Sequence, residues 1–247
     1  MNTGDTGQEH APGEAGAAVV LGATGGIGAA LVAALEAEGR WRRVIGLSRR
    51  SEPAVDIPAV DITDEASIAA AAAWLAGEAP DLALVVVATG FLHAGRFQPE
   101  KAMRQLDPAH LAQSFAVNAI GPAMAMKHLL PRLRRDGPAV FATLSARVGS
   151  IGDNKLGGWW SYRASKAALN QLVRTASVEL KRANPGAAIL AIHPGTVDSG
   201  LSSPFSKAGL DVQAPAEAAR RILDVVRGMA PSDSGGFFDH KGAPVAW

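Results

Sequence analysis

Tyr162 and Lys166 are the residues whose types and spacing point most directly to chemistry. Tyr162 is the only tyrosine of the chain, and Lys166 follows four residues later in a stretch whose apolar residues recur with helical period. Side chains at i and i+4 share one face of a helix. An ammonium beside a phenol favours phenolate and lowers the phenol pKa from its ordinary value of about 10. The pair predicts a general acid/base; the alternative is an ordinary pair on an amphipathic helix.

A glycine-rich segment follows the first apolar run of the chain. Ala17–Leu21 leads directly into Gly22-Ala-Thr-Gly-Gly26-Ile-Gly28, and a helical stripe follows. Glycine allows a tight turn and a close approach to a pyrophosphate, while a helix N-terminus offers free N–H groups. The segment predicts a nucleotide site, and a plain strand-to-helix turn is the alternative.

The second apolar run ends in Ser48-Arg49-Arg50. In dinucleotide-binding folds a carboxylate at this place bonds the ribose 2′-hydroxyl, whereas an arginine accepts a 2′-phosphate. Because no carboxylate stands in this turn, charge favours NADP(H) over NAD(H). The alternative is a pair of solvated surface arginines.

The secondary structure that would position these residues is indicated by the order of apolar segments. Short apolar runs alternate with longer stretches of helical period along the chain. This order predicts an α/β fold: a single-domain, Rossmann-like, doubly wound parallel sheet of about seven strands with helices on both faces. The expected strands are Ala17–Leu21, Arg43–Leu47, Val55–Val60, Leu82–Ala88, Ala139–Leu144, Ala187–Ile192 and Gly236–Phe238. The expected helices are Ile27–Glu38, Asp64–Ala76, Leu111–Arg134, Ser161–Arg182 and Ala216–Arg227.

Local signals mark two helix starts and one long loop. Thr63, followed by two acidic residues, is expected to cap one helix, and Pro215 suits the first turn of another. The stretch from Thr196 to Gln213 mixes Gly, Ser and Pro with apolar residues and predicts a lid, with a merely mobile connection as the alternative.

Composition narrows the class of protein. A chain of 247 residues with 48% hydrophobic residues and a net charge of +1 predicts one domain over 17–247, preceded by a disordered tail over 1–16. The balanced charge predicts neither a nucleic-acid partner nor an anionic membrane surface. No apolar run approaches the roughly 20 residues that span a bilayer.

The absence of cysteine excludes disulfides, thiolate metal sites and cysteine nucleophiles. It also fits a reducing, cytoplasmic location. No His, Asp and Glu cluster has metal-ligand spacing, so no metal is expected.

The glycine segment, Asn118 in Val-Asn-Ala-Ile-Gly-Pro, the Tyr162-Arg-Ala-Ser-Lys166 segment and Pro194-Gly195 together resemble the short-chain dehydrogenase/reductase family over about residues 17 to 240. The segment that begins at Ser145 and the ending Gly-Gly-Phe-Phe-Asp-His further resemble its subgroup of sniffer-type carbonyl reductases and bacterial C-factor proteins.

The resemblance implies catalytic roles for four residues. Tyr162 would protonate the carbonyl oxygen, and Lys166 would lower its pKa while bonding the nicotinamide ribose. Asn118 would hold a water that relays protons, unless it is an ordinary asparagine at a helix kink. Ser145 would polarise the substrate.

The resemblance also implies a cofactor site. Pro194 and Gly195 would close over the nicotinamide, with Val197 and Ser199 at its carboxamide, and Ile62 would contact adenine with Asp61, which could equally be a turn residue. The other expected cofactor residues are Gly22, Thr24, Gly26, Ile27, Gly28, Ser48, Arg49, Ala88, Thr89, Gly90, Tyr162 and Lys166.

The chain departs from the family pattern in three places. Val87-Ala88-Thr89-Gly90 stands where the family writes Asn-Asn-Ala-Gly. The family's S-x-x-G spacing, counted back from Gly149, lands on Ala146 and leaves Ser145 one position early; because strand side chains alternate, Ser145 could face the wrong side, and Ser150 is a further candidate. The interval from Ser145 to Tyr162 is also longer than usual, with Gly-Gly-Trp-Trp in the extra length.

Aromatic and apolar residues surround the expected acid/base. Trp159, Trp160, Phe91, Leu92 and the 201–205 segment predict an apolar pocket, and ordinary core or subunit contacts are the alternative for the tryptophans. The expected reaction is reduction of an apolar aldehyde or ketone by NADPH.

An NADP-binding signalling or regulatory protein of C-factor type is the alternative function. Members of the family are often homodimers or homotetramers. The resemblance therefore implies a homo-oligomer here, in which the expected helices Leu111–Arg134 and Ser161–Arg182 would form the subunit contacts.

Overall fold

Apolar side chains alternate along the central strands between two separate clusters, one on each face of the sheet. In the first strand Val19 and Leu21 belong to one cluster, and Val20 belongs to the other. Successive strand residues point to opposite faces, so a strand buried on both sides must be apolar throughout. This pattern requires helices on both faces.

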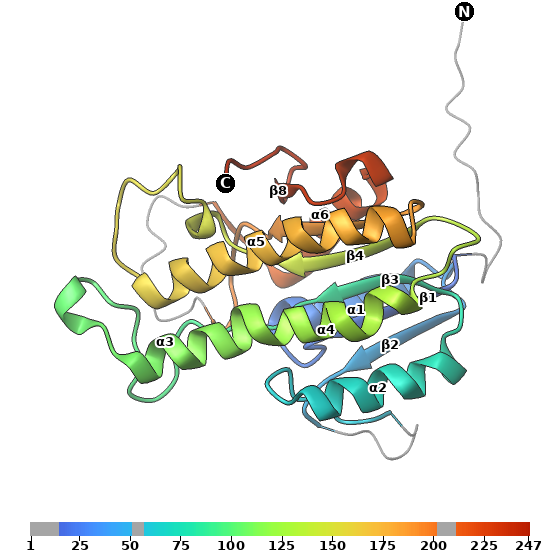
Figure 1. The fold of residues 1–247 in the computed structure, drawn as a ribbon, viewed down its shortest axis with the longest axis horizontal. Helices are drawn as coiled ribbons and strands as arrows, with labels where there is room; N and C mark the ends of the chain where they lie inside the picture. The colour runs from blue at the N-terminus through green and yellow to red at the C-terminus, as the bar shows by residue number, and fades with distance from the viewer. Residues whose placement is uncertain (1–14, 51–56, 202–210) are drawn as a thin grey trace, which may run out of the picture.

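The computed structural model describes residues 15–50, 57–201 and 211–247. Its main sheet has six strands in the order β2-β1-β3-β4-β5-β8, and every neighbouring pair is parallel. The strands are β1 (Ala17–Leu21), β2 (Arg43–Leu47), β3 (Leu82–Val87), β4 (Ala139–Leu144), β5 (Ala187–His193) and β8 (Phe237–Asp239). The doubly wound parallel fold expected from the sequence is confirmed (Figure 1).

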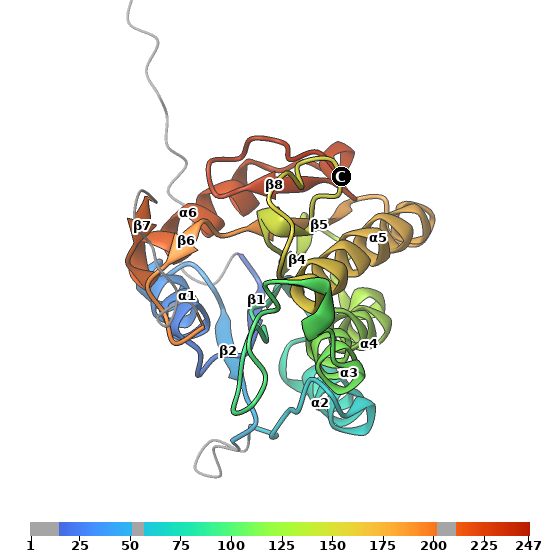
Figure 2. The ribbon, with the colours of Figure 1, turned by 90° about the vertical axis from the view of Figure 1, so that its left-hand side faces the viewer.

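Helices cover both faces of this sheet (Figure 2). Helices α1 (Gly26–Ala37) and α6 (Pro215–Gly228) pack on one face. Helices α2 (Glu65–Glu78), α4 (Gly121–Leu129) and α5 (Trp160–Ala183) pack on the other. Pro215 stands in the first turn of α6, as expected. Within the described ranges, no helix is both long and apolar enough to cross a membrane.

The expected strand Val55–Val60 is wrong in its described part. Residues 51–56 lie outside the described residues, and residues 57–60 contain one bridge residue, Ile57, but no strand. Pro58 has no N–H to donate to a ladder, and the Val60 amide bonds the Ser48 carbonyl. Within residues 15–50, 57–201 and 211–247 the main sheet has six strands, compared with the seven expected for the whole chain.

The single helix expected over Leu111–Arg134 is also wrong. The chain forms α3 (Pro108–Phe115), a π-helical turn (Ala116–Ile120), α4 and a 3₁₀ turn (Leu130–Arg132). Pro122 cannot donate a backbone hydrogen bond, which interrupts the regular α-helical ladder near the π-helical turn.

The expected cap of α2 is shifted by one residue. Asp64 is the N-cap, and its carboxylate accepts from the Ala66 N–H at 3.0 Å. The Thr63 hydroxyl instead donates to Asp61 at 2.7 Å.

The stretch predicted as a lid is described only at its ends. β6 (Thr196–Val197) pairs in parallel with β7 (Val212–Gln213), and residues 202–210 lie outside the described residues, as do residues 1–14 of the expected tail.

Phe141 in β4 is fully buried, so its truncation tests the core beneath the site. We expect Phe141→Ala to lower the free energy of unfolding by about 3–5 kcal/mol, because it removes buried surface and leaves a cavity. Urea titration measures the loss. The control Val178→Ala, at an exposed position of α5, should stay within about 0.5 kcal/mol of the parent. Equal effects of the two substitutions would contradict the expectation.

Candidate active site

Helix α5 brings Tyr162 and Lys166 to the carboxyl end of β4. The Tyr162 side chain is buried, and the Lys166 Nζ lies 5.8 Å from the centre of its ring. Lys166 is also buried and donates from Nζ to the Leu144 carbonyl at 2.7 Å. The helical spacing therefore places the two side chains together, as the sequence predicts.

Burial sets the proton affinities of both groups. It raises the pKa of Tyr162 above its ordinary value, because desolvation disfavours phenolate. It lowers the pKa of Lys166 to about 7, because desolvation also disfavours the ammonium. The expected lowering of the Tyr162 pKa by Lys166 is thus outweighed by burial in this structure. Tyr162 is a neutral phenol, and hence a proton donor, near neutral pH.

Asn118 occupies the π-helical turn between α3 and α4. Its side chain accepts from the Phe91 N–H at 2.8 Å and donates to the Phe91 carbonyl at 2.8 Å and to the Ser165 Oγ at 3.0 Å. These bonds join the loop after β3 to α5. π-helical turns often occur at functional sites. The water relay expected at Asn118 stays a prediction.

Ser145 does not direct its hydroxyl to Tyr162. Its Oγ donates to the Asn170 Oδ1 at 2.7 Å, two helical turns further along α5 than Tyr162. Ala146 instead packs in the cluster that contains Tyr162. The one-residue offset in the sequence therefore turns the hydroxyl away, because consecutive side chains at a strand end point in different directions. The alternative, Ser150, is buried and accepts from the Asp153 N–H at 3.2 Å.

An apolar wall lies beside Tyr162. Leu92, Ala146 and Tyr162 form a small buried cluster, with partly buried residues Val148, Trp159 and Leu201 packed against it. The Trp159 ring meets the Tyr162 ring edge-on at 6.2 Å. Sequence reasoning named Leu92 and Trp159 but missed Ala146 and Val148 as lining residues. The S-x-x-G count that landed on Ala146 carried the signal for that position.

The other predicted aromatic residues lie elsewhere. Trp160 is 39% exposed. Phe91 packs against Phe97 and His110 at centroid distances of 6.4 and 5.9 Å.

The glycine turn has the close approach that the sequence predicts. Gly22 has φ of +87°, and a Cβ there would lie 3.1 Å from Ala88 and Thr89. A Cβ at Gly28 would lie 2.1 Å from the Gly22 carbonyl oxygen. Only glycine fits at these two places, and the turn delivers the chain into α1.

The start of α1 is suited to an anion. No side chain caps its N-terminus, and its first turn contains no acidic residue. The adjoining Thr89 Oγ1 is buried without a hydrogen-bond partner among the described residues. Free N–H groups and an orphaned hydroxyl fit the phosphates and ribose of a dinucleotide. Thr24 and Gly26 are exposed at this turn, and Ile27 packs against the cluster under α1.

The carboxyl end of β2 carries the predicted adenosine-side residues. Ser48 Oγ accepts from the Arg50 N–H at 3.2 Å, and Arg49 is exposed. The Asp61 carboxylate accepts hydrogen bonds from the N–H of Thr63 at 2.9 Å and from the hydroxyl of Thr63 at 2.7 Å. These bonds hold the pKa of the Asp61 carboxyl below its usual value. Asp61 therefore stabilises this turn, and its expected contact with adenine stays a prediction.

The remaining predicted cofactor residues line the same edge of the sheet. Ile62 is buried under α4, where a Cβ at Gly121 would lie 2.3 Å from its carbonyl oxygen. A Cβ at Gly90 would lie 3.8 Å from Leu201. A Cβ at Gly26 would lie 3.3 Å from Ser199, so the segment after β5 reaches the glycine turn.

The turn after β5 is held by Gln213, which sequence reasoning did not single out. Its Nε2 donates to the Pro194 carbonyl at 2.7 Å. Gly195 has φ of +82°, and a Cβ there would lie 2.1 Å from the same nitrogen. Val197 is buried in β6.

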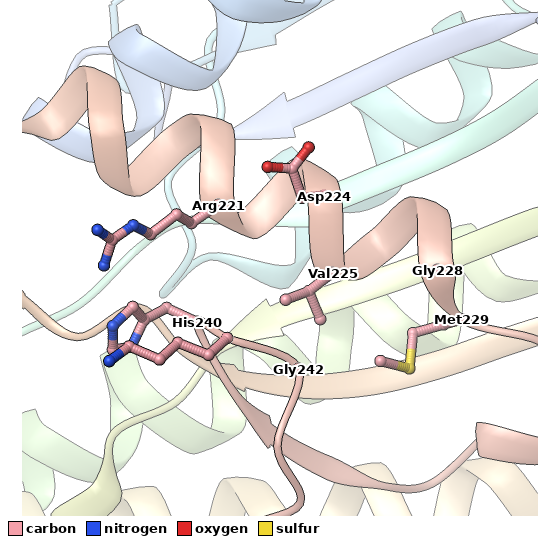
Figure 3. Close-up of a pocket in the computed structure, with 8 residues that line it drawn as sticks. Arg221, Asp224, Val225, Gly228, Met229, His240 and Gly242 are labelled. Atoms are coloured by element: carbon pink, nitrogen blue, oxygen red, sulfur yellow. The ribbon is translucent and has the colours of Figure 1, made fainter. Parts of the chain in front are cut away.

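A separate hollow of about 410 Å³ lies between α6 and the chain after β8 (Figure 3). None of the predicted site residues lines it. Its lining residues are Arg221, Asp224, Val225, Gly228, Met229, His240, Lys241 and Gly242.

Comparison with known proteins assigns the family. The model of the short chain dehydrogenase family matches residues 16–209. The chain belongs to the short-chain dehydrogenase family. It is therefore an oxidoreductase, as the motifs predicted.

Two relatives illustrate how similar this chain is to other members of the family. C-signal of Myxococcus xanthus is 37% identical over 147 residues, which are 59% of this chain and 84% of that protein. The 1-hydroxy-2-glutathionyl-2-methyl-3-butene dehydrogenase of Rhodococcus sp. strain AD45 is 29% identical over 190 residues, 77% and 79% of the two chains.

Solved structures extend the likeness to nearly the whole fold. The NADPH-bound carbonyl reductase from chicken fatty liver has a TM-score of 0.79 and 25% identity, covering 93% of this chain and 98% of that one. The carbonyl reductase Sniffer of D. melanogaster has a TM-score of 0.80 at 22% identity, covering 94% and 99%.

The lowered pKa of Lys166 makes a prediction about stability. Between pH 8 and about 10 the unfolded chain keeps the lysine proton and the folded protein does not, so this group makes the free energy of unfolding rise with pH by about 1 kcal/mol per pH unit. Lys166→Met should remove that rise. Urea titrations at several pH values measure both slopes, with the exposed Lys181→Met as control. Equal slopes in Lys166→Met and the parent would show that Lys166 keeps its ordinary pKa.

Proposed function

We propose that this protein is an NADP(H)-dependent reductase that interconverts an apolar aldehyde or ketone with its alcohol, with Tyr162 as the general acid/base. The observation that carries the proposal is the buried Tyr162–Lys166 pair beside an apolar wall, at the same sheet edge as the glycine turn. NADP(H) is supported by the glycine turn, by Arg49, and by the NADPH-bound carbonyl reductase of similar fold.

The residues of the chain would divide the work at the site. The turn at Gly22–Gly28 and the start of α1 would hold the pyrophosphate, and Arg49 would pair with the 2′-phosphate. The bound cofactor supplies the hydride. Pro194 and Gly195 would close over the nicotinamide.

Tyr162 would give its proton to the carbonyl oxygen as the carbon is reduced. Its raised pKa keeps the phenol protonated near neutral pH. Lys166 lies beside the ring and, with its lowered pKa, exchanges protons near neutral pH. The apolar wall of Leu92, Ala146 and Trp159 would exclude water and receive the apolar part of the substrate.

A second candidate is an NADP-binding signalling protein with little turnover. Two observations favour it. Ala146, which has no hydroxyl, packs against Tyr162 in the place expected of a substrate-polarising serine. C-signal of Myxococcus xanthus is also 37% identical over the matched region.

Tyr162→Phe tests the acid role, because it removes only the phenol oxygen. With a panel of apolar aldehydes and ketones, we expect NADPH oxidation to fall by at least about 100-fold while the variant still binds NADPH. Absorbance of the reduced nicotinamide measures the rate. Thr175→Val, which removes a hydroxyl from the exposed face of α5, is the matched control. Full activity in Tyr162→Phe would refute the acid role, and tight NADPH binding without turnover in the parent would favour the signalling candidate.

Arg49→Ala tests the choice of cofactor. Loss of a charge-assisted bond to the 2′-phosphate should weaken NADPH binding by about 10-fold or more and leave NADH binding unchanged. Calorimetric titration measures both affinities. Arg182→Ala, at an exposed position near the far end of α5, should change neither. If Arg49→Ala weakened both cofactors equally, Arg49 would not be reading the 2′-phosphate.

A further inference from the structure

The helix that carries Tyr162 starts from an unusual backbone segment. Gly157, Gly158 and Trp159 all have positive φ, at 63°, 66° and 51°, and no other non-glycine residue among those described does. A bulky residue in this region is strained and persists only where its surroundings hold it. Trp159 is also the N-cap of α5, and its side chain makes no capping hydrogen bond. Other groups must therefore hold the turn and satisfy the first amides of the helix.

Glu100, from a distant part of the chain, holds the turn and also satisfies an amide in the first turn of the helix. Its backbone carbonyl accepts from the Trp159 N–H at 2.5 Å. Its carboxylate accepts from the Ser161 N–H at 3.2 Å and from the Ser161 hydroxyl. An N-cap side chain ordinarily bonds the second or third amide of its own helix, and Ser161 is the second residue of α5. Glu100, 61 residues earlier, takes that place.

The Glu100 carboxylate is almost fully buried, at 2% exposure. A buried carboxyl group is costly unless hydrogen bonds satisfy it. In addition to Ser161, the Glu100 carboxylate contacts the side chain of buried His110, whose Nδ1 lies 3.1 Å from the Glu100 Oε1. The positive end of the α5 dipole adds a favourable field for a carboxylate at this position. The Glu100 carboxylate therefore connects the start of α5 with His110 of α3.

The same contact reaches the apolar wall through a second route. His110 in α3 stacks on Phe97 at 5.1 Å and meets Phe91 edge-on at 5.9 Å. Phe91 is fixed by Asn118, and the next residue, Leu92, packs in the cluster with Tyr162. The loop after β3 and the start of α5 are thus joined through Glu100.

A further residue secures the left-handed turn from the helix side. Arg163, which follows Tyr162, donates from Nε to the Gly158 carbonyl at 3.0 Å. Asn154 accepts from the Gly157 N–H at 3.0 Å. These two bonds hold the turn from one side, and the bonds of Glu100 to Trp159 and Ser161 hold it from the other.

We propose that Glu100 is a positioning residue for the reaction, one that fixes the Tyr162 phenol and the Trp159 wall through its bonds to Trp159 and Ser161. This assignment rests on the proposed function, because it gives Glu100 a catalytic consequence only where Tyr162 is the acid. It also gives a role to the additional Gly-Gly-Trp-Trp length before the acid.

Glu100→Gln tests the assignment, because glutamine keeps the size of the side chain and loses the charge. Tyr162 is the only tyrosine, so protein containing tyrosine labelled with carbon-13 at Cζ gives one resonance that reports its surroundings directly. We expect Glu100→Gln to shift this resonance and to lower kcat by about 10- to 100-fold, since small displacements of a reacting group are costly. The Kd for NADPH should stay unchanged, because Glu100 bonds Trp159, Ser161 and His110, none of which is among the predicted cofactor residues. Glu179→Gln, at an exposed position of α5, is the matched control.

Ser161→Ala provides a second test that keeps the carboxylate and decides the matter if Glu100→Gln does not fold. It should shift the resonance and lower kcat in the same direction by a smaller factor. An unchanged resonance and an unchanged kcat in both variants would overturn the proposal. So would a fall in kcat that follows only the loss of folded protein. A resonance that moves in Glu100→Gln while Tyr162→Phe keeps full activity would overturn the proposed function alone, because the contact would still position Tyr162.

Discussion

The buried hydrogen bond from the Lys166 Nζ to the Leu144 carbonyl is the contact on which the geometry of the site depends. A buried amine must find an acceptor, and the backbone at the end of β4 supplies one. The bond is possible only because α5 lies very close to the segment after β4. Gly149 marks that approach, since a Cβ there would lie 2.8 Å from the Lys166 Cβ. With Lys166 fixed in this way, Tyr162 lies one helical turn earlier, at the carboxyl edge of the sheet.

The burial that fixes this pair also sets its chemistry. Desolvation raises the pKa of Tyr162 and lowers that of Lys166 to about 7. Burial thus favours the uncharged form of both side chains. Near neutral pH the phenol is therefore protonated, and the neighbouring amine has a pKa at which it can exchange protons. The same apolar surroundings that exclude water from the wall produce these shifts, so positioning and proton affinity have one cause.

The cofactor edge follows from topology. The order of the sheet reverses between β1 and β3, and in open α/β sheets the crevice at such a reversal receives ligands. Gly22 at the end of β1 touches Ala88 and Thr89 at the end of β3, so the glycine turn lies at this reversal. The same fold extends over 93% of the chain in a carbonyl reductase with only 25% identity.

The sequence by itself determined the features that depend on local bond geometry. Alternation along the strands set the two faces of the sheet, and the spacing of four residues put Tyr162 and Lys166 on one side of α5, because these periods are properties of the backbone. Pro58 has no N–H to donate, and residues 57–60 form no strand where the alternation predicts one.

The tertiary structure decided whatever depends on partners far apart in the chain. It turned the Ser145 hydroxyl toward Asn170 and put Ala146 against Tyr162. It brought Glu100 to the start of α5, and it made burial outweigh the charge of Lys166 in setting the Tyr162 pKa. No local period encodes these outcomes, since each depends on how closely separate elements pack and on how much water that packing excludes.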